Sequence, residues 1–252
     1  MKKFFLPVLL LAMLLACGCG DSLTKPPEDE PEQPADSPST PEPPSGGEEN
    51  DTEQPRDPVE IEGLVLVSDL DDTIVIDLKY ATTDNFTGQV IYPVAVAAIK
   101  KETGERLVQA NRIFQADGYT IKLWDAYRPY SAQRRLWEVF PDPRYVIKPE
   151  DQLPTSGFKA RHYNGMAVDI TLLDRYGNEL EMPTAFDEFS EKAAPGYPHV
   201  SEEARSNAAY LISVMESAGF KVAPTEWWHF NDAAGTPTPY LDIPLEAFLE
   251  GR

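Results

Sequence analysis

The sequence contains only three histidines, and two of them stand near carboxylates in patterns that could bind a metal ion. His162 is followed by Gly165, which favours a turn, and then by Asp169 within a segment that reads as a strand. A turn followed by a strand can bring His162 and Asp169 toward the same point. Further along the chain, Glu226 and His229 supply a second carboxylate and a second histidine.

Two neutral imidazoles and one carboxylate can hold zinc in a tetrahedral site whose fourth position is left for water. A second carboxylate outside the metal shell would then act as a general base toward that water. The spacings alone leave a plainer alternative open, namely ordinary hydrogen-bonded polar residues, because H-x6-D and E-x-x-H also arise by chance. An ideal strand would place positions 226 and 229 on opposite faces, so the metal hypothesis requires a bulge or a turn there.

The elements that must position these residues are read from hydrophobic periodicity. Strands are predicted at 64–67, 74–78, 120–124, 167–173, 221–222 and 226–230. Helices are predicted over 93–116, from a cap at Ser131, and from a cap at Ser201 to a stop at Gly219. Helices and strands mix without a regular β-α alternation, so the predicted class is α+β.

The first residues resemble an export signal. Lys2 and Lys3 precede an apolar run, Phe4 to Ala16, that is too short to span a bilayer stably. The run ends in Leu-Leu-Ala-Cys, which resembles the signal of bacterial lipoproteins. That resemblance implies that residues 1–16 are removed and that Cys17 carries a lipid, which would make the protein an extracytoplasmic, membrane-anchored lipoprotein. An ordinary signal peptide and an uncleaved anchor are the alternatives.

The charge has two sources. The chain carries 42 acidic against 22 basic residues, a net charge of −20, which argues against nucleic acid as a partner and disfavours attraction to anionic lipid. Residues 20–60 contribute −11, and residues 20–58 hold 10 of the 24 prolines. Such a segment cannot bury enough apolar surface to fold, so residues 17–58 are predicted to be a disordered acidic tether and 59–252 the folded domain.

Five segments in order resemble the D-alanyl-D-alanine dipeptidase family, zinc peptidases of the type found in vancomycin resistance. The segments are 76–88 (IDLKYATTDNFTG), 124–129 (WDAYRP), 162–169 (HYNGMAVD), 186–187 (FD) and 226–229 (EWWH). The resemblance covers about residues 60–245. It implies a single zinc-peptidase domain of the D,D-peptidase and hedgehog type, with a small antiparallel sheet flanked by helices.

The resemblance also implies roles for particular residues. His162, Asp169 and His229 would bind one Zn²⁺ per chain, and Glu226 would be the catalytic base. Arg128 would stabilise the oxyanion, a role that suits its permanent charge, and Asp187 would bind the free ammonium of a small dipeptide. No protein partner is implied. The family usually has serine two residues before its first ligand histidine, and Ala160 stands there instead, which puts in question a substrate contact made by that hydroxyl.

Parts of the sequence are also compatible with other functions. A D,D-carboxypeptidase acting on peptidoglycan stem peptides would use the same centre, and a non-catalytic wall-binding lipoprotein would have lost a ligand or the base. The segment from Asp69 to Thr73 is similar to the nucleophile motif of haloacid-dehalogenase-type phosphatases, in which Asp69 would be phosphorylated and Asp71 would be the acid/base. No convincing downstream acidic pair accompanies it, so a turn between strands is the simpler interpretation. The third histidine, His199, is expected at the surface or beside the site, and Trp227 and Trp228 in the core and pocket wall.

Overall fold

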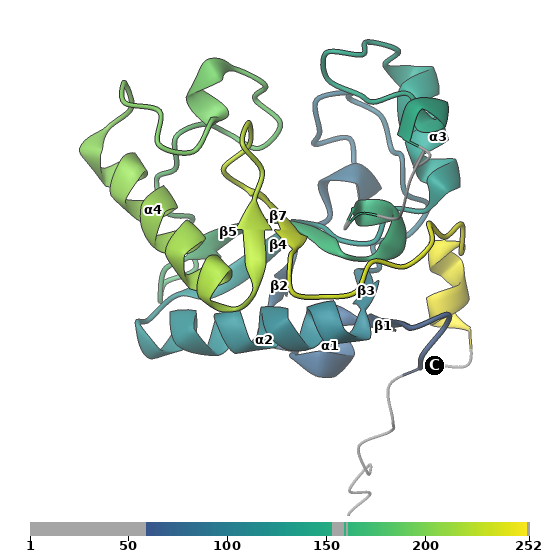
Figure 1. Ribbon diagram of the computed structural model, residues 1–252, viewed down its shortest axis with the longest axis horizontal. Helices are drawn as coiled ribbons and strands as arrows, with labels where there is room; N and C mark the ends of the chain where they lie inside the picture. The colour runs from purple at the N-terminus through teal and green to yellow at the C-terminus, as the bar shows by residue number, and fades with distance from the viewer. Residues whose placement is uncertain (1–58, 153–158, 160, 251–252) are drawn as a thin grey trace, which may run out of the picture. The chain divides into compact units, whose positions relative to one another are not determined.

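A five-stranded sheet in the order β2-β4-β5-β7-β6 forms the centre of the fold in the computed structural model (Figure 1). The structure describes residues 59–152, 159 and 161–250. Only the pair β2-β4 is parallel, and the other neighbours are antiparallel. The strands are β2 (Val75–Ile76), β4 (Thr120–Asp125), β5 (Ala167–Leu173), β6 (Phe220–Val222) and β7 (His229–Asp232).

A smaller antiparallel pair and four α-helices complete the regular structure of the described residues. The pair consists of β1 (Leu64–Leu66) and β3 (Ala98–Lys100). The helices are α1 (Val67–Leu70), α2 (Lys101–Ala116), α3 (Tyr130–Val139) and α4 (Glu202–Ser217). Short 3₁₀ helices lie at Lys79–Ala81, Pro149–Gln152, His162–Asn164, Glu191–Ala193 and Leu245–Leu249. Within the described residues, none of these helices has the length and apolarity needed to span a bilayer. The predicted α+β class is confirmed.

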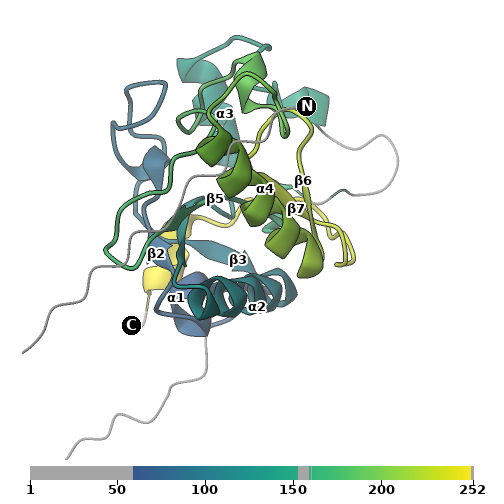
Figure 2. The same ribbon diagram turned by 90° about the vertical axis from the view of Figure 1, so that its left-hand side faces the viewer.

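Two long helices pack against each other and against the sheet. Figure 2 shows α2 and α4 side by side in front of it, and α2 contacts β4 while α4 contacts β6. The face of α2 that carries Leu107, Ala110 and Phe114 is fully buried. Ile113, which the sequence pattern places on the same face, is instead 42% exposed. The apolar stripe of α2 is therefore narrower than the periodicity indicates.

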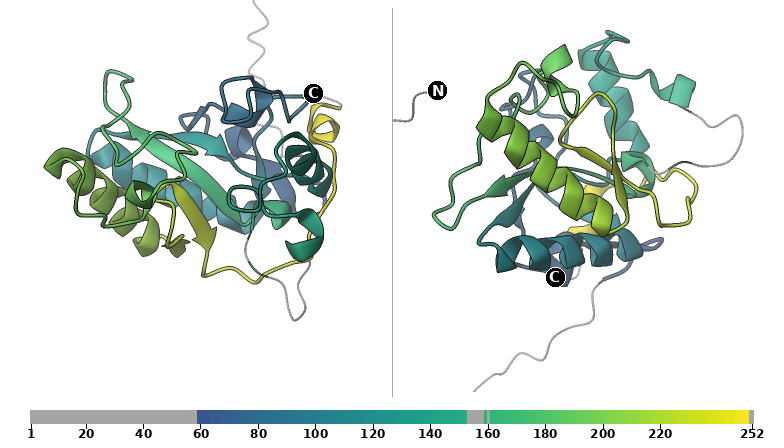
Figure 3. Two further views of the ribbon diagram at one scale, coloured as in Figure 1. Left: turned by 90° about the horizontal axis from the view of Figure 1, so that it is seen from above. Right: turned by 60° about the vertical axis from the view of Figure 1, so that its left-hand side comes forward.

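The central strand β5 divides the interior between core and site. Seen from above, β5 and β7 lie side by side (Figure 3). Val168, Ile170 and Leu172 point to the face that joins the hydrophobic core. Successive side chains alternate, so Asp169 and Thr171 lie on the other face, where each lines a cavity. All seven residues of β5 are buried, which shows that both faces of this strand are covered.

Two expected helix starts are wrong. The helix predicted from position 93 begins at Lys101, because residues 98–100 pair with β1 as a strand. The helix predicted to be capped by Ser131 begins at Tyr130, and the side chain of Asp242 accepts the hydrogen bond from the backbone N–H of Ser131. Ser201 is the predicted cap, since its Oγ accepts a hydrogen bond from the N–H of Ala204 at 2.9 Å.

Candidate active site

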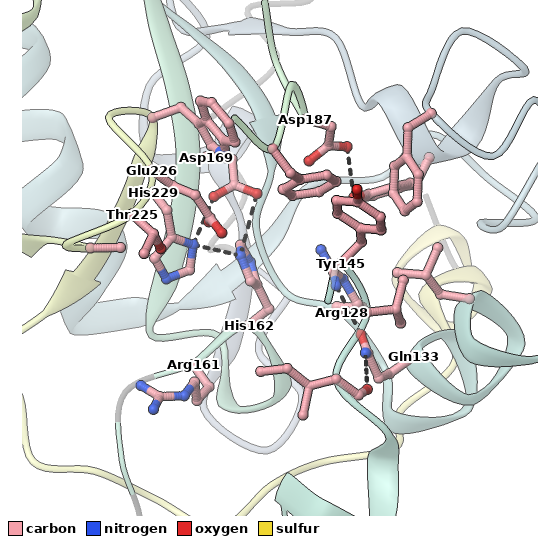
Figure 4. Close-up of a pocket in the computed structure, with 18 of the residues that line it drawn as sticks. Arg128, Gln133, Tyr145, Arg161, His162, Asp169, Asp187, Thr225, Glu226 and His229 are labelled. Atoms are coloured by element: carbon pink, nitrogen blue, oxygen red, sulfur yellow. Dashed lines mark hydrogen bonds and ion pairs between the residues drawn. The ribbon is translucent and has the colours of Figure 1, made fainter. Parts of the chain in front are cut away.

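Three side chains from three separate elements converge on one point (Figure 4). His162 begins a 3₁₀ turn, Asp169 lies on β5, and His229 opens β7. Nδ1 of His229 lies 2.9 Å from Oδ1 of Asp169, and Nε2 of His162 lies 3.4 Å from Oδ2 of Asp169. One atom from each residue can be chosen so that all three lie within 4.8 Å of one another. The structure thus brings together the three residues that the sequence proposes as metal ligands.

Strand register fixes two of these residues. Asp169 pairs directly opposite His229, so their side chains leave the sheet on the same face. On the other side of β5, a bulge between Leu123 and Asp125 places Asp125 opposite Asp169. A bulge adds one residue to a strand and redirects the side chains beyond it. Asp125, Asp169 and His229 therefore form one row across three strands.

His162 is oriented by a carbonyl group. Its Nδ1 lies 2.7 Å from the backbone oxygen of Ala126, which can only accept, so Nδ1 carries the hydrogen and Nε2 is left for a metal. The turn ends at Gly165, whose φ is 67°. A Cβ there would lie 2.7 Å from the backbone nitrogen of Lys100, so the site needs glycine at this position.

The electrostatics of the three residues suit a divalent cation. Burial alone would raise the pKa of Asp169, but His162 and His229 hold that pKa below its usual range. Burial alone would lower the pKa of His162, but the charges of Asp169 and Asp125 raise it. A carboxylate held ionised between two imidazoles is a donor set that zinc prefers. The residues present therefore fit one zinc ion.

Glu226 reaches the same cavity through a turn. The N–H of His229 donates to the carbonyl oxygen of Glu226 at 3.3 Å, and β7 begins only at His229. The single strand predicted over 226–230 is therefore wrong, and the turn that the metal hypothesis requires is present. Burial and the charge of Asp169 raise the pKa of Glu226, although His229, His162 and Arg128 act in the opposite direction.

A cavity of about 350 Å³ unites the predicted site residues. Trp228 and several other aromatic residues form part of its wall. The lining contains all six of the predicted ligand, catalytic and substrate-binding residues of the described chain: Arg128, His162, Asp169, Asp187, Glu226 and His229. Trp227 is fully buried beside Trp228, at a ring-centroid distance of 5.5 Å, so both tryptophans pack as expected.

Arg128 is held by a buried network. Its Nε donates to Oδ2 of Asp125 at 3.1 Å, and its Nη1 donates to Oε1 of Gln133 at 2.8 Å. Asp125 is fully buried and also accepts a hydrogen bond from the hydroxyl of Tyr92 at 2.6 Å. Although burial would lower it, the pKa of Arg128 is raised, chiefly by Asp125. The guanidinium is permanently charged and fixed in direction.

Asp187 lies at one end of the cavity in a strained conformation. Its φ is 58°, a value that residues other than glycine seldom adopt. The hydroxyl of Tyr80 donates to Oδ2 of Asp187 at 2.9 Å. Burial and the charge of Asp169 raise the pKa of Asp187 well above its usual range, against the lowering effect of Tyr80. A cation bound to this carboxylate would stabilise its charged form and so oppose the effects of burial and of Asp169 on the pKa.

Three residues of the site are not assigned a role by the sequence reasoning: Tyr80, Asp125 and Gln133. Tyr80 and Asp125 lie inside the motif segments 76–88 and 124–129, so the family resemblance of these segments could have marked both as site residues. Gln133 lies four residues beyond the second of these segments, and nothing in its local pattern marks it.

The other residues that the sequence singled out do not line the catalytic cavity or lie outside the described residues. Asp71 accepts hydrogen bonds from the N–H of Thr73 at 3.0 Å and from Nδ2 of Asn111 at 3.0 Å, which ties the segment after α1 to α2. Asp69 lies within α1, so this region is a connector rather than a simple turn. His199 is exposed, and its ring meets the ring of Tyr197 edge to face at a centroid distance of 5.7 Å. Cys17 and Ala160 lie outside the described residues.

One small cavity thus contains a candidate zinc site, and a separate carboxylate and a fixed guanidinium face it. A one-zinc peptidase requires these groups, and the protein belongs to the zinc metallopeptidases. The sequence profile of the D-ala-D-ala dipeptidase family (Peptidase M15) matches residues 60–246, so the chain is a member of that zinc-dependent family.

Several relatives of the chain are named D-alanyl-D-alanine dipeptidase, like the family. A D-alanyl-D-alanine dipeptidase of Escherichia coli (strain K12) is 37% identical over 174 residues, covering 69% of this chain and 86% of the relative. One of Enterococcus faecium is 32% identical over 187 residues, covering 68% of this chain and 92% of the relative. A solved structure of the vancomycin resistance D,D-pentapeptidase VanY in complex with Zn(II) is 15% identical, with a TM-score of 0.33, and covers 62% of this chain and 80% of that one.

Proposed function

We propose that this protein hydrolyses D-alanyl-D-alanine, or a closely related free D,D-dipeptide, outside the cytoplasm. The observation that carries the proposal is the position of Asp187 in the same small cavity as the three metal ligands and Glu226. Such a cavity accepts a short substrate with a free ammonium group. The names of the relatives support D-alanyl-D-alanine as that substrate.

The residues divide the reaction among them. A zinc ion held by the triad would supply the Lewis acidity that lets water lose a proton near neutral pH and that polarises the peptide carbonyl. Glu226 takes the proton of the attacking water and passes it to the leaving amine. The raised pKa of Glu226 makes its carboxylate a stronger base, which favours the first of these two transfers.

Arg128 and Asp187 position the substrate. The guanidinium of Arg128 is directed by Asp125 and Gln133 and stabilises the negative charge that develops on the carbonyl oxygen. Asp187 binds the ammonium group of the dipeptide and thereby requires an unblocked amino terminus. A longer peptide or an acylated one would place uncharged amide atoms against that buried carboxylate, which is unfavourable.

The test uses the full chain loaded with zinc. We expect one zinc per chain, release of D-alanine from D-alanyl-D-alanine, and no release after chelation. Glu226→Ala should keep the zinc and lose about 100-fold or more in kcat. Glu216→Ala, an exposed glutamate on α4, is the matched control and should retain activity. An inactive wild type with zinc bound, or an active Glu226→Ala, contradicts the proposal.

Two further substrates separate the alternatives. Ready cleavage of N-acetyl-D-alanyl-D-alanine would favour a D,D-carboxypeptidase, because that substrate has no ammonium group for Asp187. Hydrolysis of a phosphate ester that is abolished by Asp69→Asn would favour the phosphatase. The hydrogen bonds of Asp71 to Thr73 and Asn111 count against an acid/base role for that residue.

The proposal includes export and a lipid anchor on Cys17. It rests on the signal-like sequence up to Cys17 and on the acidic, proline-rich residues 20–58. An exported enzyme meets dipeptides released by turnover of the cell wall, whereas destroying cytoplasmic precursors requires a cytoplasmic enzyme, so the proposed role is salvage. Membrane fractionation should find the wild type with the membranes and Cys17→Ser released from them. Active wild type in the cytosolic fraction contradicts this part.

A further inference from the structure

A second cavity, of about 480 Å³, lies beside the catalytic one. Among the described residues, Phe86 alone lines both cavities. Phe186 lines the second cavity, and the next residue in the chain, Asp187, lines the catalytic one, so the two cavities are close neighbours. The residues assigned to the reaction all line the catalytic cavity and not the second one.

Two buried tryptophans line the second cavity, and they differ in their hydrogen bonding. Nε1 of Trp227 donates to Oγ1 of Thr184 at 2.9 Å. Nε1 of Trp124 is buried and has no hydrogen-bond partner among the described residues. An indole N–H can only donate, and buried polar groups in folded proteins nearly always have partners. The N–H of Trp124 therefore points to a ligand that supplies an oxygen acceptor.

A second polar atom of the same cavity is in the same state. Oγ1 of Thr171 is buried and has no hydrogen-bond partner among the described residues. The exposed fractions of Trp124 and Thr171 are 3% and 1%. In the described part of the chain, three buried side-chain atoms lack such a partner, and two of the three belong to residues that line this one cavity. Their coincidence favours a binding site over two unrelated defects of packing.

Strand register explains why these two side chains meet. Thr171 on β5 pairs with Lys122 on β4, two residues before Trp124. Residues two apart on a strand point to the same face, so Trp124 and Thr171 are diagonal neighbours on one face of the sheet. Side chains in this relation can contact the same small ligand.

We infer that the second cavity binds a secondary amide carried by an uncharged molecule. The C=O of the amide accepts the hydrogen bond of Trp124, and its N–H donates to the hydroxyl oxygen of Thr171. A trans amide presents these two groups in opposite directions, so one amide can bridge two side chains that lie on either side of it. The inference adds a binding site to the protein and does not depend on the proposed hydrolysis.

The rest of the lining suits the apolar part of such a molecule. The ring of Trp124 lies 4.9 Å from that of Phe186 and 5.9 Å from that of Trp227, measured between centroids. Leu180 and Met182 also line the cavity and are half-buried. Because the two unpartnered atoms are themselves covered, the amide reaches them when a side chain of this wall moves, and the unbranched side chain of methionine readily adopts other rotamers.

The charges around the second cavity favour a ligand without net charge. One lysine and two acidic residues line it. Nζ of Lys79 lies 2.7 Å from Oδ2 of Asp84 and 3.1 Å from Oδ2 of Asp77. Oε1 of Glu179 lies 2.8 Å from Nζ of Lys122. Each charged group of the lining thus has an opposite partner, and a carboxylate or ammonium on the ligand would have to compete with one.

The experiment observes the tryptophan side chains directly. The four tryptophans give four indole N–H signals in the NMR spectrum of the ¹⁵N-labelled full chain, and Trp124→Phe assigns one of them. The probes are N-acetyl-D-glucosamine, for an amide on a sugar, and N-acetyl-D-alaninamide, for an amide in a blocked peptide. At least one probe should move the Trp124 signal downfield to saturation with a Kd of about 1 mM, as suits so small a ligand, and the tighter probe identifies the source. The signal of Trp137, which lies outside the second cavity, should stay in place.

A control probe and two variants test the amide and the threonine separately. D-glucose has no amide and should leave the Trp124 signal in place. Thr171→Val keeps the shape of the side chain and removes the hydroxyl, so it should weaken binding about 5-fold or more without lowering Tm, since no partner within the described chain is lost. Thr236→Val, at an exposed threonine outside the second cavity, should bind like the wild type.

Three results overturn the inference. They are the absence of a shift with either probe, an equal shift with glucose, and unchanged affinity in Thr171→Val. The first of these would assign the two buried atoms to bound water instead of a ligand. Because the readout is binding, each result holds whether or not the protein hydrolyses D-alanyl-D-alanine.

Discussion

The hydroxyl of Tyr80 donates a hydrogen bond to Asp187 at 2.9 Å, although 107 positions separate them in the sequence. The ring of the same tyrosine lies under the guanidinium of Arg128, whose Cζ is 4.9 Å from the ring centroid. Tyr80 thus contacts both the group proposed to bind the ammonium and the group proposed to stabilise the oxyanion. A shift of this one side chain would be felt at two points of the substrate.

Tyr80→Phe should weaken the enzyme most at low pH. Burial and Asp169 already raise the pKa of Asp187, and the hydrogen bond from Tyr80 opposes that rise. Without it the pKa rises further, so Asp187 is protonated over a wider range and binds ammonium less often. We expect the acid limb of kcat/KM to move to higher pH, with a loss of about 10-fold on that limb. Tyr176→Phe, at a tyrosine that is 81% exposed, should leave the profile unchanged. Superimposable profiles for Tyr80→Phe and wild type would count against this role.

Gln133→Ala should lower kcat without removing the metal. Gln133 accepts from Arg128 and donates to the carbonyl of Ile147, both at 2.8 Å, so it fixes the guanidinium relative to the cavity wall. Loss of one such bond costs about 1 kcal/mol, or about 5-fold in rate if it is realised in the transition state. Gln133→Glu keeps the acceptor and should retain more activity than Gln133→Ala. Zinc content and kcat are measured together, and equal activity of the two variants would show that the acceptor is not required.

Gly165→Ala should destabilise the protein more than Gly177→Ala. Both glycines have positive φ, 67° and 82°, so both substitutions cost about 1 kcal/mol of backbone strain. A Cβ at Gly165 would also lie 2.5 Å from Leu64 and 2.7 Å from the backbone of Lys100, whereas nothing lies within 4 Å at Gly177. We expect Tm to fall by about 3 °C for Gly177→Ala and by at least twice that for Gly165→Ala. Equal decreases in Tm for the two variants would mean that Leu64 and the backbone of Lys100 move away from the added Cβ without cost.

Asp77 should stabilise the fold at neutral pH and not in acid. Burial raises its pKa, but Lys122 at 2.8 Å and Lys79 at 3.1 Å lower it overall. A lowered pKa in the folded state means that the stabilisation is present above the unfolded pKa of about 3.9 and is lost as the pH falls below it. Partly exposed pairs contribute up to about 1 kcal/mol, so Asp77→Asn should lower Tm by about 3 °C at pH 7. At about pH 2.5 the difference should largely disappear, and a constant difference would contradict the linkage.

The candidate site was predicted better from sequence than the elements that hold it. His162, Asp169, Glu226 and His229 lie in short segments whose residue types are specific, and the structure brings them together. Gln133 was missed because its role is defined by partners, Arg128 and Ile147, that its own local pattern does not reveal.

The boundary errors have a different origin. Residues 96–99, Val-Ala-Ala-Ile, suit a helix by composition, but pairing with β1 makes part of this segment a strand. Ser131 is a good helix cap in isolation, yet Asp242, 111 positions away, satisfies its backbone N–H instead. In both cases a distant segment overrides the local preference, which periodicity alone does not detect.

The row of Asp125, Asp169 and His229 also determines at which stage of folding the candidate site can form. Its three members lie on strands that follow one another at long intervals along the chain, and the last of them is on β7. In a chain that emerges from its amino terminus, the residues of β4 and β5 are present well before residue 229 is available to pair. Contacts between such distant segments form late in folding, because long loops must close first. The complete set of candidate ligands can therefore exist only after almost the whole chain has emerged, in the compartment where β7 pairs with β5.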